Sequence, residues 1–121
     1  MTKSYHSDIL DNGLSVVASS NQMMICSSAP TTRAQAISLA LATVAMTSGN
    51  FTLGSYAGGR KSTVVAKSSI LIDVTGAATH LALIDATRLL VVDEGDGQTL
   101  TANGVNVVNI PTWDVKLANP V

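Results

Sequence analysis

Cys26, His80 and Asp85 are of the residue types that form nucleophilic catalytic triads. In such a triad a carboxylate orients a histidine, and the histidine activates a cysteine thiolate for attack. Any short chain contains such a trio by chance, and Cys26 follows the apolar run Met23-Met24-Ile25. We therefore predict that Cys26 is a buried strand thiol that packs as a small hydrophobe. We expect a structural hydrogen bond for His80, and we predict that the protein is not an enzyme.

Residue types that bind metals do not occur at metal-ligand spacing. His6 and His80 are the only histidines, and they lie far apart in the sequence without a second cysteine to complete a zinc site. Asp93, Glu94 and Asp96 lack the alternating acidic pattern of a calcium loop. We predict a solvated hairpin turn at Glu94–Gly97, and no metal-binding residue.

The glycine-rich stretch Gly54–Gly59, followed by Arg60-Lys61, is the one candidate for anion binding. It contains neither of the glycine patterns that hold the phosphates of nucleotides. We predict a flexible surface loop there. Trp113 is expected in the core or at a subunit contact. No residue is assigned a catalytic or cofactor-binding role, and no cofactor is expected.

The composition points to a protein that works through its surface. Only 12% of the 121 residues are charged and the net charge is −1, whereas about a quarter of residues are charged in typical globular domains. Such a surface suits burial against neighbouring molecules. The sequence has no basic stripe that would indicate a nucleic-acid partner. No apolar run reaches the roughly 18 residues that a membrane span needs. With no secretory signal apparent and one cysteine, we expect a protein made in a cytoplasm.

The spacing of apolar residues, which predicts the secondary structure, changes from helical to alternating along the chain. Apolar residues at helical spacing predict a helix over 4–18, within a helical or arm-like segment at 1–20. The Asn12-Gly13 dipeptide either breaks this helix or is tolerated within it. Residues 22–26 are predicted as a buried strand, and Thr32 is expected to cap a short helix over 33–37. Residues 39–46 fit helix and strand equally.

Strand patterns recur every 8–12 residues in the second half of the chain. This spacing is typical of all-β sandwiches and jelly rolls. We predict a mainly β fold, a β-sandwich or jelly-roll-like arrangement of antiparallel sheets with an N-terminal helix, in a single β-rich domain over 1–121. The predicted strands lie at 62–67, 70–74, 80–85, 105–110 and 113–117, with another at 89–92 that is covered on both faces.

Four segments together resemble small structural proteins of tailed bacteriophages. They are Met24 to Thr32, Gly59-Arg60-Lys61, Ala77 to Asp85 and Val107 to Pro111. The resemblance implies a virion structural protein, most simply a capsid decoration (cement) protein that stabilises the head. The alternative is a fibre or spike-base, collar or tail adaptor that attaches other virion components. The implied partners are copies of itself and other virion proteins, the major capsid protein first. The implied location is the virion, assembled in the bacterial cytoplasm.

Overall fold

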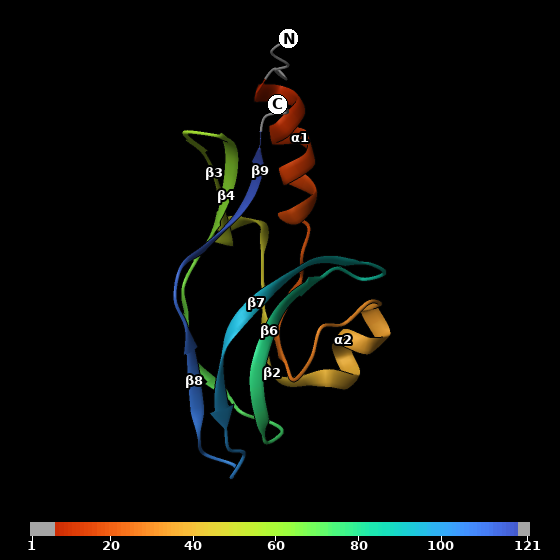
Figure 1. Ribbon diagram of the computed structural model, residues 1–121, viewed down its shortest axis with the longest axis vertical. Helices are drawn as coiled ribbons and strands as arrows, with labels where there is room; N and C mark the ends of the chain where they lie inside the picture. The colour runs from red at the N-terminus through yellow and green to blue at the C-terminus, as the bar shows by residue number, and fades with distance from the viewer. Residues whose placement is uncertain (1–6, 119–121) are drawn as a thin grey trace.

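The chain forms a mainly β structure with an N-terminal helix, which confirms the predicted fold class. The computed structural model describes residues 7–118, so the first six residues of the predicted helical or arm-like segment 1–20, His6 among them, lie outside the described residues. The strand pairs between residues 7 and 118 are all antiparallel. The elements (Figure 1) are α1 (Ser7–Val17), β1 (Gln22–Cys26), α2 (Arg33–Leu39), β2 (Ala40–Ala45), the 3-10 turn η1 (Ser48–Asn50), β3 (Phe51–Tyr56), β4 (Gly59–Val64), β5 (Lys67–Leu71), β6 (Gly76–Ile84), β7 (Leu89–Leu100), β8 (Val107–Ile110) and β9 (Trp113–Ala118).

Helix α1 buries the apolar stripe that its periodicity predicts. Leu10, Leu14 and Val17 are all buried, at the i, i+4 and i+7 spacing of one helix face. The helix runs through Gly13 without a break. A Cβ at Gly13 would lie 3.1 Å from a methyl group of Leu117, so the missing side chain permits close approach of α1 to β9.

The ambiguous segment 39–46 divides between the two structures it fits. Thr32 caps α2 as predicted, because its side-chain oxygen accepts the N–H of Gln35 at 3.1 Å. The helix ends at Leu39, and Ala40 begins strand β2. Pairing with β1, which sets Met23 opposite Val44, satisfies the backbone of this segment and decides in favour of the strand.

The strands enclose the main core but leave it open on one side. They follow one another in the order β7-β6-β1-β2 in one sheet and β5-β8 in another. Backbone N–H groups of Asp73 and Val74, just after β5, donate to the carbonyl of Leu41 in β2 and join these two sheets. On the other side β7 and β8 are edge strands, and no backbone hydrogen bond links them in the described part of the chain. The sheets are compatible with the predicted sandwich.

A third sheet and the two helices complete the structure. The sheet β3-β4-β9 lies against α1 at one end of the molecule (Figure 1). Met23 and Ile25 of β1 point into the main core, while Met24 and Cys26 pack in a second cluster under α2. Burial on both faces explains why β1 is an uninterrupted apolar run.

Both predicted glycine-rich connections are wrong, because strands extend into the first and run through the second. The predicted loop Gly54–Gly59 is a β-hairpin: β3 continues to Tyr56, and β4 begins at Gly59. The predicted turn Glu94–Gly97 lies inside β7. There β7 bulges, since His80 pairs with Glu94 and Ala78 with Gln98, which leaves three residues of β7 opposite one of β6.

Several strand boundaries also differ from the predictions. β4 ends at Val64, and β5 spans Lys67–Leu71, so the predicted strands 62–67 and 70–74 are shifted. The strand at 89–92 is not covered on both faces, because Val92 is exposed. Its position in β7, at the edge of the sheet, explains this exposure. The strands β1 and β9 lie where the sequence predicts them.

Candidate functional site

The trio Cys26, His80 and Asp85 does not form a catalytic relay. Cys26 and His80 are neighbours across β1 and β6, but the thiol is fully buried and contacts the carbonyl oxygen of Ala36 at 3.7 Å. Burial raises the pKa of Cys26 to about 11, which keeps the thiol protonated and a poor nucleophile. The ring of His80 hydrogen-bonds the hydroxyl of Thr79 at 2.9 Å, the kind of local contact we predicted.

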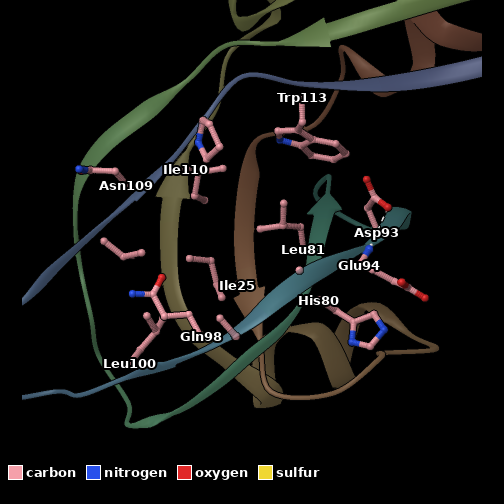
Figure 2. A pocket seen from close by; sticks show the side chains of 14 residues that line it. Ile25, His80, Leu81, Asp93, Glu94, Gln98, Leu100, Asn109, Ile110 and Trp113 are labelled. Carbon is pink, nitrogen blue, oxygen red and sulfur yellow. Dashed lines mark hydrogen bonds between the residues drawn. The ribbon is translucent and has the colours of Figure 1, made fainter.

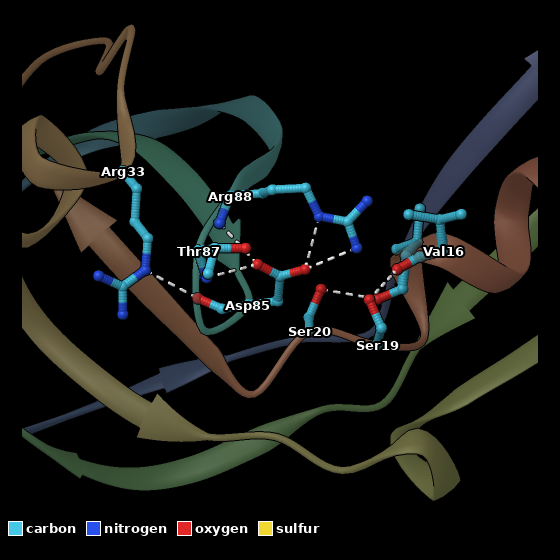
Figure 3. A network of polar contacts seen from close by, with 8 residues as sticks. Val16, Ser19, Ser20, Arg33, Asp85, Thr87 and Arg88 are labelled. Carbon is cyan, nitrogen blue, oxygen red and sulfur yellow. Dashed lines mark hydrogen bonds and ion pairs between the residues drawn. The ribbon is translucent and has the colours of Figure 1, made fainter.

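Asp85 instead holds the turn between β6 and β7 (Figure 3). Its carboxylate accepts the backbone N–H groups of Thr87 and Arg88 at 2.9 and 2.6 Å, and it pairs with the Arg88 guanidinium at 2.7 Å. The Thr87 N–H is the main reason why the pKa of Asp85 falls to about 2, with further lowering from Arg88. Arg33 of α2 donates to the Asp85 carbonyl at 2.8 Å, so the network joins a helix to a turn.

The two basic residues that follow the predicted loop Gly54–Gly59 are engaged in ion pairs. Arg60 binds the carboxylate of Asp11 at 2.7 Å and so fastens α1 to β4. Lys61 lies 3.5 Å from the carboxylate of Asp114 in β9. The hydroxyl of Thr63, with Lys61, holds the pKa of Asp114 below its usual value. These contacts give the basic residues a structural role between neighbouring elements.

A cleft of about 270 Å³ opens between β7 and the segment that joins β8 to β9 (Figure 2). Its walls come from β1, β6, β7, β8 and β9, and most of the side chains in them are apolar. The opening coincides with the side on which β7 and β8 do not pair. The apolar lining includes Ile25, Leu81, Leu100, Val108, Ile110 and Trp113.

Polar groups gather at the mouth of this cleft. Asp93 and Glu94 of β7 lie at one rim; Asn109 of β8 lies at the other, where its side-chain oxygen accepts the backbone N–H of Ser69 in β5 at 2.8 Å. Both carboxylate-bearing residues are exposed, and neither makes an ion pair with any residue in the described range. The indole Nε1 of Trp113 is buried without a hydrogen-bond partner in the described structure. A more polar hollow continues along β7 and β8 toward their connecting loop.

A second surface feature is a group of exposed apolar residues in and beside β5 and β8. The loop between β7 and β8 lies at the end of the molecule opposite α1 (Figure 1). We define this tip patch as Leu71, Val74, Val105 and Val107, which are 47%, 52%, 76% and 52% exposed. Leu71 and Val107 pair across β5 and β8, so the patch spans both strands.

The loop that carries Val105 is ordered. The side-chain oxygen of Asn103 accepts the N–H groups of Val105 and Asn106 at 3.0 and 2.8 Å. Gly104, between Asn103 and Val105, adopts a left-handed backbone, which glycine reaches without strain. Local polar bonds therefore present an exposed apolar side chain in a fixed position.

Neither the cleft nor the tip patch was among the sequence-based candidates. Trp113 was singled out, and it packs against the main core as one of the two expected placements. The cleft residues come from strands distant in sequence, so no local motif marks them. The alternation of Val108 and Ile110 in β8 is the one local sign of an inward-facing apolar row.

Three further findings concern metal sites, membrane-spanning helices and similarity to known proteins. Among the side chains that the structure describes, no three His, Cys, Asp or Glu residues are placed to share a metal ion. None of the helices within residues 7–118 has the length and apolar character for spanning a membrane. Comparison of the chain with family models, curated proteins and solved structures finds no match.

Proposed function

We propose that the protein is a bacteriophage virion structural protein that decorates and stabilises the capsid. Its resemblance to small structural proteins of tailed phages supports this assignment, and so does its weakly charged composition. In this role the protein associates with copies of itself and with the major capsid protein. Its place of action is the surface of the assembled head.

The tip patch is the observation that carries the proposal. Single exposed apolar residues are ordinary, but a group of them marks a contact surface. Here Leu71 and Val107 lie opposite each other on paired strands, and Val105, in the loop just before β8, is 76% exposed. Covering such a patch with a neighbouring subunit removes apolar area from water, which favours association. We assign this patch to contact with the capsid shell.

Binding to the shell stabilises it by mass action. A protein that binds only the assembled state lowers the free energy of that state, by about 2.7 kcal/mol per site at a concentration of 100 times Kd. This mechanism requires a shaped surface and no reacting group. Particles that lack the protein should therefore disassemble at lower temperature or lower salt.

The test compares Val105→Lys with Val16→Lys. Both change an exposed valine to lysine, but Val16 lies on α1, away from the tip patch. We expect Val105→Lys to remain folded and to leave the particle, and Val16→Lys to stay bound. Equal occupancy of the two variants, or particles whose heat resistance does not depend on the protein, would refute the assignment. Copies spread over the whole head support decoration, whereas copies confined to a vertex or tail indicate an adaptor.

A further inference from the structure

The gap between β7 and β8 has the form of a missing strand position. Both strands are edges of their sheets, and each therefore has backbone N–H and C=O groups with no strand partner on that side. The strands are joined by the loop at 101–106 and diverge from it, with the cleft and the polar hollow lying along the divergence. An added strand would join the two sheets where the order β7-β6-β1-β2 and β5-β8 is interrupted.

The size and lining of the cleft match side chains of an extended segment. Its volume of about 270 Å³ lies just below the roughly 300–1,000 Å³ of pockets that hold whole small molecules. Side chains alternate in direction along a strand. An extended segment beside β8 would therefore direct alternate side chains inward, onto Leu81, Leu100 and Ile110.

The negative charge at the mouth of the cleft indicates which polar side chains the added segment, called the guest below, should carry. Asp93 and Glu94 lie on the rim of β7 without an ion-pair partner among the described residues. Like charges facing each other across paired strands are destabilising, so this edge disfavours a second β7 strand and favours lysine or arginine. The bulge at Gly95–Gly97 also breaks the β7 ladder, so most backbone bonds of the guest would go to β8.

The ring of Trp113 contributes an apolar wall to the cleft (Figure 2). Its Nε1 is buried without a hydrogen-bond partner in the described structure, so the indole offers the carbon part of its ring to a segment seated in the cleft. Such an aromatic surface suits an apolar side chain of that segment.

We propose that the gap between β7 and β8 is a binding site for an extended segment of a partner protein. The segment alternates apolar residues with lysine or arginine and adds as a strand to the free edge of β8. This mode is strand addition, in which backbone bonds provide affinity and pockets provide specificity. The site shares Val107 of β8 with the tip patch, but Leu71, Val74 and Val105 do not line it, and the proposal does not depend on the capsid assignment.

Two synthetic peptides test the proposal. Each is about seven residues long, enough to span β8, and alternates valine with lysine in one peptide and with glutamate in the other. Trp113 is the only tryptophan in the chain, so its fluorescence reports filling of the cleft. Backbone amide shifts and hydrogen exchange measured by NMR locate the peptide. We expect the lysine peptide to bind and to protect amides of β8.

Charge-reversal variants provide the matched control. Glu94→Lys should weaken binding of the lysine peptide about fivefold, the upper end for one exposed charge pair. Asp73→Lys, which reverses an exposed residue near the tip patch, should leave binding unchanged, and so should Val105→Lys. These variants separate failure of the site from failure of the capsid assignment.

Three results would overturn the proposal. One is the absence of shifts in β7 and β8 at millimolar lysine peptide. Another is equal binding of the glutamate peptide. The last is protection of the same β8 amides at high protein concentration without peptide, because that result would assign the gap to a second copy of the chain.

Discussion

The reactivity of Cys26 distinguishes a structural thiol from a catalytic one. Its side chain is fully buried, and burial raises its pKa to about 11 from the 9.0 of an ordinary cysteine. At pH 8 this difference reduces the thiolate fraction about 100-fold, because the fraction changes tenfold per pKa unit. The reagent also reaches the thiol only when the structure opens. We expect labelling in the native protein to be at least ~1,000-fold slower than in guanidinium.

The assay follows release of the chromophore from an aromatic disulfide reagent at pH 8. The matched control carries Cys26→Ala with Ser48→Cys, which moves the single thiol to an exposed position. This control should react within seconds, and Cys26 should react far more slowly, through the small population of opened molecules. Native labelling of Cys26 within about tenfold of the control would refute the reasoning, because it would require an accessible, ionised thiol.

Three other changes test the fold around the candidate site, each by urea unfolding. Leu83→Ala should lower the free energy of unfolding by about 3–5 kcal/mol, since it leaves a cavity at a fully buried core position, whereas Leu53→Ala at an exposed position should cost far less. Asp85 has a folded pKa of about 2, below its ordinary 3.8, so its contribution to the free energy of unfolding is present above pH 4 and is lost as pH falls toward 2. Asp85→Asn should therefore flatten the dependence of stability on pH between pH 4 and pH 2. An unchanged dependence would contradict the turn network. Gly95→Ala should lower stability by about 1–3 kcal/mol, because its Cβ would lie 2.7 Å from the Ala78 carbonyl oxygen; a neutral effect would contradict the close β6–β7 contact at the bulge.

The sequence was sufficient to predict an element wherever the contacts that decide its structure lie within a few residues of each other. The cap at Thr32 bonds a backbone group three residues away, so α2 was predictable at its first residue. The stripe of Leu10, Leu14 and Val17 defines the buried face of α1 by its spacing alone. The apolar run Met23-Met24-Ile25 indicated a buried strand, and Cys26 is buried with it.

Tertiary structure decided the features that depend on distant partners. Glycine-rich segments favour turns in isolation, yet pairing with β6 keeps Gly95 and Gly97 inside β7 as a bulge. Residues 40–45 of the ambiguous segment form a strand because β1 offers an edge to pair with. The gap beside β7 follows from the order of strands, which no local pattern specifies. The sequence by itself determined a mainly β chain with a buried thiol, because the periodicity and apolar character of short runs are local properties. The cleft and the tip patch arise from residues far apart in sequence, so only the folded arrangement brings them together.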